Sequence, residues 1–386
     1  MWKEVIIVGA GAAGLSASAC LNKLSIDNLI LEKDDCSVPL WRKYSYDRLH
    51  LHLAKTFCEL PHLPYPKTAP TYLSKDEFVK YIDAYVQQFD LRPVYDRCVE
   101  TAVYDRAAGA WTVRAKHTRT GEAEEYRARF LVVATGENSE GYVPDVPGLD
   151  GFPGEVMHSS QYKNGVPYKD QDVLVVGSGN SGMEIALDLC NHHARASLVV
   201  RAPVHIITRE VANLGLHLFK YLPYSTVDSL QVLHSKLKYG DTAKYGIVRP
   251  TEGPNHLKDT TGKYPVVDIG TFDKIKSGDI QVYPGVKCIR SSDLEFENGS
   301  TRRFDAIIFA TGYKSTVKAW LKDDDGFFDE SGFPAEGWPS QWKGNNGLYC
   351  VGFSRKGFYG IAEDAKNVAQ DISVVLSSQS VSKPKP

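Results

Sequence analysis

The sequence has no pair of cysteines spaced for redox or metal chemistry. Its seven cysteines are scattered along the chain, and none belongs to a Cys-x-x-Cys motif. This distribution argues against a disulfide framework, a structural zinc site and a thioredoxin-like redox centre. A reducing compartment, the cytoplasm, is therefore expected.

Long hydrophobic runs and an excess of one charge are also missing. No apolar stretch approaches the roughly 18–20 residues that a membrane-spanning helix needs. The first strand-like segment begins within a few residues of Met1, which leaves no room for a signal or transit peptide. The net charge is −2 and no basic stripe is interleaved with aromatics, so nucleic acid is not an expected partner.

A glycine-rich fingerprint follows the first apolar segment. Val5–Val8 form a continuous apolar run, which is typical of a parallel strand buried on both faces. Gly9, Gly11 and Gly14 then match Gly-x-Gly-x-x-Gly, whose glycines allow a tight turn, a close approach of a pyrophosphate and close helix–strand packing. Glu32 ends the next strand-like segment, where an acid binds a ribose hydroxyl. The segment predicts a site for a dinucleotide whose adenosine ribose is unmodified.

The same pattern occurs a second time, with one change. Val173–Val176 supply the strand, and Gly177, Gly179 and Gly182 supply the turn into a helix. The following strand-like segment ends at Arg201 instead of an acid. A carboxylate there would repel a 2′-phosphate, whereas a guanidinium pairs with it. The second copy therefore predicts a site for NADPH.

This duplication organises the chain, whose 386 residues are enough for two or three domains. Two dinucleotide sites suggest a flavoprotein that passes hydride from NADPH to FAD. A strand, a glycine turn and a helix near the C-terminus are expected to complete the FAD domain. We expect an α/β fold with two Rossmann-like domains, the NADPH domain being inserted into a discontinuous FAD domain. The expected bounds are 1–163 and 314–376 for the FAD domain, 164–313 for the NADPH domain and 377–386 for a disordered tail.

Three local features carry shorter predictions. Ser74 is a plausible N-cap for the helix that follows it. Asn298–Gly299 matches a glycosylation sequon, but the pair is read as a hairpin turn between strands. His50 and His52 alternate in a strand-like run, which is compatible with metal ligands, although no third ligand stands at a recognisable spacing.

The segment FPGEVMHSSQY lies between the two fingerprints. Phe152, Gly154, His158 and Tyr162 match F-x-G-x-x-x-H-x-x-x-(Y/F/K), the identifying sequence of the class B flavin-containing monooxygenases. The chain resembles that family, which implies that these four residues help to position a cofactor. We expect Gly154 to allow a turn and the other three to pin it, with His158 structural rather than a proton carrier.

The resemblance narrows to the plant YUCCA branch, the indole-3-pyruvate monooxygenases of auxin synthesis, and runs from about residue 3 to 375. It rests on the segments YDRLHLHLAKTFCELPHLPYP, ATGEN, GSGNSGMEIALDL, LVVRAPVHIITRE, GKYPVVDIGTFDKIKSGDIQVYPGV and FATGYKS. It implies oxidative decarboxylation of indole-3-pyruvate to indole-3-acetate with NADPH and dioxygen, through a flavin peroxide.

Substrate identity stays open at this point. Phe358 and Tyr359 are bulkier than the residues usual in the family. Oxidation of another 2-oxo acid, oxidation of a soft nitrogen or sulfur nucleophile, and uncoupled NADPH oxidation are the alternatives. The sequence does not indicate an oligomeric state.

The resemblance also implies roles for individual residues. Asn138, after the Ala-Thr-Gly turn, matches the asparagine that lies beside the flavin and the nicotinamide, although a loop-capping role is the alternative. Trp41, Arg42 and Leu53 are expected to line the flavin.

Overall fold

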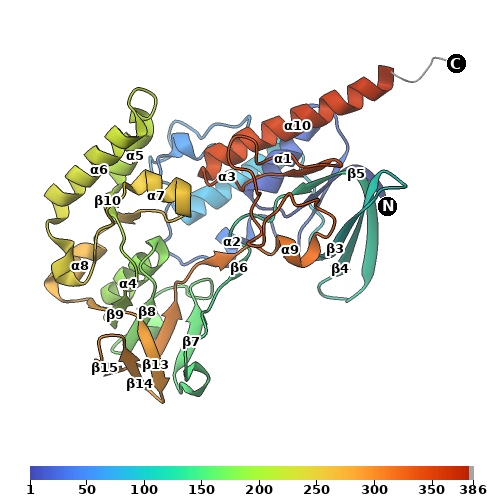
Figure 1. Ribbon diagram of the computed structural model, residues 1–386. Helices are drawn as coiled ribbons and strands as arrows, with labels where there is room; N and C mark the ends of the chain where they lie inside the picture. The colour runs from blue at the N-terminus through green and yellow to red at the C-terminus, as the bar shows by residue number, and fades with distance from the viewer. Residues whose placement is uncertain (382–386) are drawn as a thin grey trace. The chain divides into compact units, whose positions relative to one another are not determined.

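The computed structural model describes the backbone of residues 1–381 and the side chains of residues 1–378 (Figure 1). The chain divides into two compact units. The first comprises Met1–Lys43, Ala54–Glu140 and the residues from Tyr313 onward, and the second comprises Tyr44–Leu53 and Gly141–Gly312. The predicted α/β class with a discontinuous first domain is confirmed.

The first unit is built on a six-stranded sheet in the order β2-β1-β5-β4-β3, with β18 also paired to β5. The pairs β1–β2, β1–β5 and β5–β18 are parallel, and β3, β4 and β5 form an antiparallel meander. The strands are β1 (Trp2–Val8), β2 (Asn28–Leu31), β3 (Arg97–Asp105), β4 (Ala110–His117), β5 (Ala123–Val133) and β18 (Leu348–Cys350).

Helices flank this sheet. Val5, Ile6 and Ile7 of β1 are fully buried, as expected for a strand covered on both faces. The helices are α1 (Ala12–Lys23), α2 (Pro39–Arg42), α3 (Lys75–Gln88), α9 (Val317–Trp320) and α10 (Gly357–Val381), with a 3-10 turn η1 (Lys55–Phe57). Helix α10, drawn in red in Figure 1, packs along α1, so the C-terminal strand and helix complete the first unit as predicted.

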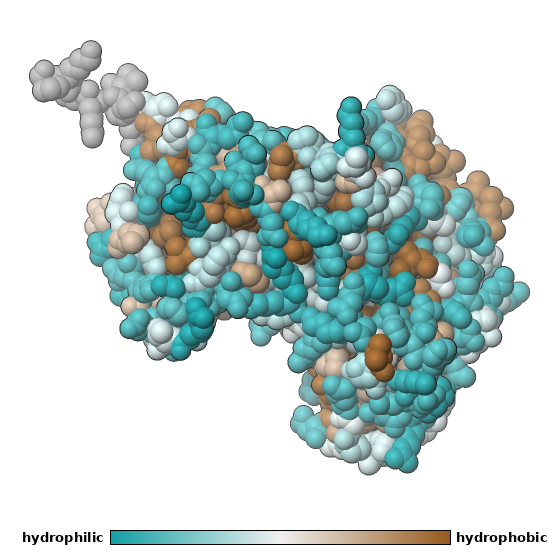
Figure 2. All heavy atoms as spheres, turned by 180° about the vertical axis from the view of Figure 1, so that it is seen from behind, coloured by the Kyte–Doolittle hydropathy of each residue, from teal (hydrophilic) through white to brown (hydrophobic). Residues whose placement is uncertain are grey.

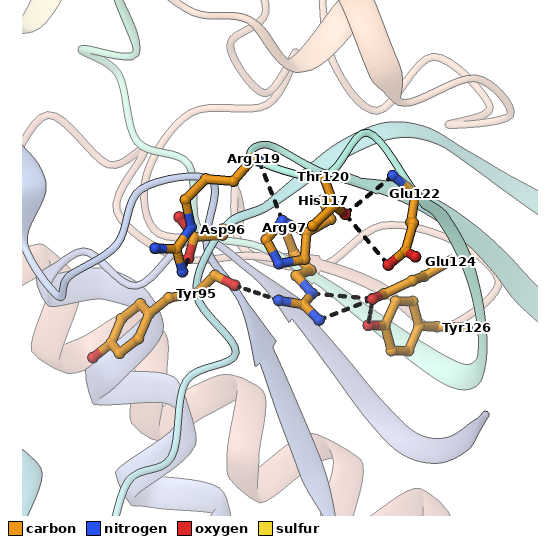
Figure 3. A network of polar contacts seen from close by, with 9 residues as sticks. All are labelled: Tyr95, Asp96, Arg97, His117, Arg119, Thr120, Glu122, Glu124 and Tyr126. Carbon is orange, nitrogen blue, oxygen red and sulfur yellow. Dashed lines mark hydrogen bonds and ion pairs between the residues drawn. The ribbon is translucent and has the colours of Figure 1, made fainter.

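Polar contacts fix two local features of the first unit. Ser74 caps α3 through a capping box with Glu77, which confirms the predicted helix start. At the end of the meander where β4 turns into β5, the guanidinium of Arg97 donates two hydrogen bonds to Glu124, at 3.1 and 2.8 Å, and the Tyr126 hydroxyl donates to the same carboxylate (Figure 3). This bidentate pair joins β3 to β5.

The second unit is built on a five-stranded parallel sheet in the order β12-β9-β8-β16-β7. Its strands are β7 (Glu155–His158), β8 (Asp172–Val176), β9 (Arg195–Val199), β12 (Gln281–Tyr283) and β16 (Ala306–Phe309). A smaller antiparallel sheet consists of β13 (Val286–Arg290), β14 (Asp293–Phe296) and β15 (Thr301–Arg303). Asn298–Gly299 lies between β14 and β15, with φ of +81° at Gly299, which confirms the predicted hairpin.

The remaining elements are helical or short. The helices of the second unit are α4 (Asn180–Asn191), α5 (Arg209–Leu218), α6 (Tyr224–Tyr239), α7 (Pro254–Thr261) and α8 (Thr271–Ser277), with 3-10 turns η2 (Leu149–Gly151), η3 (Val166–Tyr168) and η4 (Thr242–Tyr245). Two short strands pair in parallel, β10 (Ile206–Thr208) and β11 (Val266–Asp268). Strands β6 (Glu140–Gly141) and β17 (Tyr313–Lys314) lie where the chain passes between the units.

Three parts of the expected division differ from the structure. Residues 44–53 were expected in the FAD domain, but they belong to the second unit. Residues 141–163 were assigned to the FAD domain, but they belong to the second unit because β7 pairs with β16, with Glu155 opposite Ala306 and His158 opposite Phe309. Residues 377–386 were expected to be disordered, whereas α10 continues to Val381. Residues 382–386 lie outside the described part of the chain.

Candidate functional site: two glycine loops

The loop after β1 uses its three glycines for different purposes. Gly9 has a φ of +108°, and a Cβ there would lie 2.7 Å from the carbonyl oxygen of Ala134. A Cβ on Gly14 would lie 1.9 Å from the carbonyl oxygen of Gly9. A Cβ on Gly11 would meet nothing within 4 Å. Gly9 and Gly14 are therefore required by packing, whereas Gly11 borders open space at the N-terminus of α1, where phosphate binds in this type of loop.

Glu32 ties this loop to the end of β2. Its side chain is only 5% exposed, and its two oxygens accept hydrogen bonds from the backbone N–H groups of Ala10, at 2.6 Å, and Asp34, at 2.9 Å. Burial raises the pKa of the Glu32 carboxyl, and the two N–H donors oppose that rise. A carboxylate oxygen has two lone pairs, so each retains capacity for a hydroxyl donor. The residue fits the ribose of a dinucleotide held at Gly11.

The residues predicted to line the flavin are placed in different units. Trp41 lies in the first unit, with its ring centroid 4.4 Å from that of Phe78. Arg42 of the first unit forms an ion pair with Asp83 and donates to the carbonyl oxygen of Ser37 at 3.0 Å. Leu53 belongs to the second unit. The structure therefore brings Trp41 and Arg42 together on α2, and Arg42 already has an acidic partner.

The bulky Phe358 singled out in the sequence packs inside the first unit. Its ring centroid lies 5.2 Å from that of Phe78 and 6.3 Å from that of Trp41. The three rings join α2, α3 and the start of α10. Tyr359, the other bulky residue, is exposed.

The turn after β5 presents Asn138 to solvent. Gly136 has a φ of +75°, and the Ser139 hydroxyl is within hydrogen-bond distance of the carbonyl oxygens of Thr135, at 3.1 Å, and Gly136, at 3.0 Å. Among the described residues, the Asn138 amide has no hydrogen-bond partner. Ser139 thus caps this turn, and the exposed amide of Asn138 takes no part in the cap.

The loop after β8 repeats the geometry of the first loop. Gly177 has a φ of +116°, and a Cβ there would lie 2.4 Å from the carbonyl oxygen of Ala310. A Cβ on Gly182 would lie 1.8 Å from the carbonyl oxygen of Gly177, and a Cβ on Gly179 would meet nothing within 4 Å. In both units, therefore, two glycines of the loop are required by packing and the third borders open space.

Arg201 follows β9 one position further along than Glu32 follows β2. Its side chain is exposed, and within the described residues the guanidinium has no hydrogen-bond or ion-pair partner. An unpaired guanidinium at this position fits a phosphate on the adenosine ribose. The strands that follow the two loops thus end near residues of opposite charge, at positions that differ by one residue.

The four residues of the FPGEVMHSSQY frame all build the second unit. Phe152 is buried in a core cluster, and a Cβ on Gly154 would lie 2.1 Å from the carbonyl oxygen of Asp305. The Tyr162 hydroxyl donates to Asp188 of α4 at 2.7 Å. These contacts fix the edge of the parallel sheet.

His158 of the frame connects two turns. Its Nδ1 accepts a hydrogen bond from the backbone N–H of Ser160 at 3.2 Å, so Nε2 carries the proton and donates to the carbonyl oxygen of Gly312 at 3.0 Å. Burial lowers the pKa of the His158 imidazole. The arrangement suits a neutral, structural histidine.

The sequence reasoning missed one buried pair. Segment 44–53 leaves the first unit and packs in the second, where Nε2 of His52 pairs with the carboxylate of Glu184 on α4. Glu184 is almost fully buried. Nδ1 of His50 donates instead to the carbonyl oxygen of Arg48 at 2.7 Å. The described residues contain no group of three His, Cys, Asp or Glu side chains set to hold a metal ion, and no helix among them has the length and apolarity to cross a membrane.

Comparisons with known proteins agree with this geometry. The pyridine nucleotide-disulphide oxidoreductase family matches residues 6–218. The chain is 52% identical to the probable indole-3-pyruvate monooxygenase YUCCA10 of Arabidopsis thaliana, covering 97% of this chain and 98% of that protein. It is 48% identical to indole-3-pyruvate monooxygenase YUCCA4 of Oryza sativa subsp. japonica, covering 95% and 86%.

Solved structures share the fold at low sequence identity. A flavin-containing monooxygenase from Stenotrophomonas maltophilia has a TM-score of 0.72 at 19% identity, covering 97% of this chain and 99% of that chain. Cyclohexanone monooxygenase bound to ε-caprolactone has a TM-score of 0.76 at 17% identity, covering 98% and 88%. OTEMO in complex with FAD and NADP has a TM-score of 0.74 at 14% identity, covering 98% and 86%.

Proposed function

The chain belongs to the YUCCA family of indole-3-pyruvate monooxygenases, and we propose from this membership that it oxidatively decarboxylates indole-3-pyruvate. It is a flavin-dependent monooxygenase that uses a nicotinamide cofactor, dioxygen and a small-molecule substrate. In the proposed reaction, indole-3-pyruvate, dioxygen, NADPH and a proton give indole-3-acetate, carbon dioxide, water and NADP⁺. One oxygen atom enters the product acid and the other leaves as water.

One observation carries the proposal: the two glycine loops have the same geometry, and the strand that follows each loop ends close to a residue of opposite charge, Glu32 in one unit and Arg201 in the other. Glu32 in the first unit suits FAD, whose ribose is unmodified, and Arg201 in the second suits NADPH. Bound FAD, reduced by NADPH, supplies the activation of dioxygen. The residues of the chain bind the two cofactors and hold them in position.

In the first unit the chain holds the flavin nucleotide. The open space at Gly11 leaves room for the pyrophosphate, and the free N–H groups at the start of α1 donate to it. Glu32 accepts from the ribose hydroxyl while it anchors the loop through Ala10. Trp41 is proposed to lie along the flavin. The Arg42–Asp83 pair favours a supporting role for Arg42.

In the second unit the chain holds the nicotinamide nucleotide. Gly179 offers the same open space at the start of α4, and Arg201 pairs with the 2′-phosphate. Phe152, Gly154, His158 and Tyr162 act on this cofactor indirectly, because they fix the sheet that carries the loop. Their role is therefore proposed to be positioning.

The amide of Asn138 is proposed to orient a cofactor ring. It is exposed in a turn that Ser139 caps, so its donor group is available. A fixed ring excludes water and keeps oxygen chemistry directed at the substrate. Leu53 remains a proposed lining residue.

The cytoplasm is the proposed compartment. All seven cysteines, each within the described residues, are free thiols. Free thiols persist in a reducing environment.

One assay tests the proposed reaction. Purified protein is expected to be yellow, and with NADPH, air and indole-3-pyruvate it should form indole-3-acetate, identified by mass, in proportion to NADPH consumed. Parallel reactions with phenylpyruvate and with an organic sulfide test the alternative substrates. Hydrogen peroxide equal to the NADPH consumed, without indole-3-acetate, would identify an uncoupled oxidase and contradict the proposal.

A further inference from the structure

Helix α6 turns its polar residues inward. Asp228, Gln231 and Ser235 are all buried against the second unit. The Ser235 hydroxyl donates to the carbonyl oxygen of Ile206 at 2.7 Å, and Asp228 accepts from the backbone N–H of Asn255 at 2.9 Å. These hydrogen bonds fix which side of the helix faces its own unit.

The opposite side of α6 carries leucines. Leu230, Leu233 and Leu237 are 45%, 54% and 79% exposed, and their spacing of three and four residues places them on one face. A surface helix ordinarily buries such a face. Figure 2 shows hydrophobic side chains at the margin formed by α5 and α6. Leu230, Leu233 and Leu237 are called the leucine face below.

Lysines border the leucine face on both sides. Lys236 and Lys238 precede and follow Leu237, so they project to either side of it. Lys220 lies in the short connection between α5 and α6, beside Tyr221, which is 82% exposed. Within the described residues, none of the three lysines has an ion-pair partner.

The wider hairpin is basic within an acidic chain. Residues 209–263 contain eight Lys or Arg and five Asp or Glu, a net charge of +3, whereas the whole chain has −2. Two of the acids are engaged internally: Asp228 through its hydrogen bonds and Asp259 as acceptor from the Tyr224 hydroxyl. This basic surface is therefore complementary in charge to an anionic partner.

The size of the leucine face argues against a protein occupant. Three partly exposed leucines offer on the order of a few hundred Å², whereas a stable dimer buries about 800 Å² on each partner. A coiled coil needs about three or more heptads of apolar residues, and the leucine face extends over one. In a symmetric dimer, Lys236 and Lys238 would also face like charges.

We propose that the leucine face and its lysines dock this protein in-plane on an anionic lipid bilayer. Shallow docking of a protein surface on lipid is favoured by an exposed apolar face, basic residues on both sides of it and an aromatic residue near the lipid headgroups, and the α5–α6 hairpin provides all three. The leucines enter the headgroup boundary, and Lys236 and Lys238 contact the lipid phosphates.

Vesicle sedimentation tests this directly. Holoprotein is incubated with sucrose-loaded vesicles of phosphatidylcholine alone or with about 30 mol % phosphatidylserine, at low salt. We expect at least about fivefold more protein in the pellet with phosphatidylserine than without it. Leu230→Ser/Leu233→Ser/Leu237→Ser should fall to the phosphatidylcholine level, and Lys236→Glu/Lys238→Glu should do the same.

A matched control changes exposed residues elsewhere in the same unit. Val166 is 63% exposed and Lys169 is exposed, so Val166→Ser/Lys169→Glu removes one apolar and one basic side chain from another surface of the unit. This control should pellet like the native protein. All variants should keep the native melting temperature and flavin content, since the exchanged side chains are exposed.

Three outcomes would overturn the proposal. The first is equal pelleting of native protein with both vesicles, and the second is native-like pelleting of the leucine variant. The third is absence of vesicle binding together with binding to a protein. Self-association that the leucine variant abolishes would identify a dimer interface. Binding of a synthetic acidic leucine-heptad peptide would identify a protein partner. None of these results bears on the proposed reaction.

Discussion

Nε2 of His158 donates a hydrogen bond to the carbonyl oxygen of Gly312 at 3.0 Å, and so joins the end of β7 to the turn after β16. The two strands are already paired, with His158 opposite Phe309. Gly312 is the last residue of the second unit before the chain returns to the first. The histidine thus holds in place the point where the chain leaves the second unit.

His158→Ala should destabilise the protein by about 1–3 kcal/mol, because it leaves the Gly312 carbonyl without its donor. Burial lowers the pKa of His158 below its ordinary 6.5, so its contribution is present above pH 6.5 and is lost as pH falls. Urea unfolding gives the free energy of unfolding of the variant and of the native protein at pH 8 and at mildly acidic pH. The difference between the two proteins should be larger at pH 8. Exposed His256→Ala, in helix α7, is the control, and an equal loss in both variants would contradict the assignment.

Gly14→Ala should impair folding, whereas Gly11→Ala should impair flavin binding. A Cβ on Gly14 would overlap the Gly9 carbonyl, which should cost about 3 kcal/mol or more and impair folding. A Cβ on Gly11 enters open space, so Gly11→Ala should keep the fold within about 1 kcal/mol and lose flavin affinity at least about tenfold. Thermal melting and flavin absorbance after gel filtration measure the two effects. Full flavin retention in Gly11→Ala would remove Gly11 from the site.

Arg201→Ala should raise the KM for NADPH about 10- to 100-fold, the loss expected for one charge-assisted phosphate contact. The KM for NADH should change little, because NADH has no 2′-phosphate. Initial rates of flavin reduction with each nucleotide measure both values. Lys276→Ala, which removes an exposed charge from the same unit, is the control. A parallel loss with NADH would mean that Arg201 does not select the phosphate.

Asn138→Ala should raise the hydrogen peroxide released per NADPH severalfold, because a less fixed ring admits water. Ser139→Ala is the control for the turn, because the Ser139 hydroxyl lies within hydrogen-bond distance of two carbonyl oxygens of that turn. It tests whether loss of the cap alone raises peroxide release. Peroxide and indole-3-acetate are measured in the same reaction. Unchanged coupling in Asn138→Ala would exclude the proposed role.

Arg97→Ala should cost about 1 kcal/mol at neutral pH, since it removes a bidentate, half-buried ion pair. Arg97 and the Tyr126 hydroxyl hold the pKa of Glu124 below its ordinary 4.5, so this contribution is present above pH 4.5 and is lost as pH falls. Urea unfolding of native protein and variant at neutral and acidic pH should show the difference shrink in acid. Arg114→Ala, at a more exposed pair, should cost less. A difference that does not depend on pH would contradict the pair.

Local patterns made much of the fold predictable. The strand, the glycine spacing and the small-residue helix are contiguous in the chain, so Gly9–Gly14 and Gly177–Gly182 could be assigned from sequence, and the structure gives both loops the same shape. Ser74 and Gly299 were predictable for the same reason, since capping and hairpin chemistry act over a few residues.

Long-range pairing was not predictable in the same way. Residues 141–163 join the second unit through a sheet partner about 150 positions later, β16, and no local signal encodes that pairing. The His52–Glu184 contact spans 132 positions. The leucines of α6 have the spacing of a buried face, and only the hydrogen bonds of Asp228 and Ser235 reveal that they point outward.

The discontinuity of the first unit sets an order of assembly during synthesis. Its last sheet strand, β18, and its helix α10 leave the ribosome after every residue of the second unit. The second unit can therefore close while β5 still lacks the neighbour that pairs with Leu131–Val133. In a nascent chain all of the second unit is therefore available to fold before the sheet of the first unit, which begins earlier in the chain, can be completed.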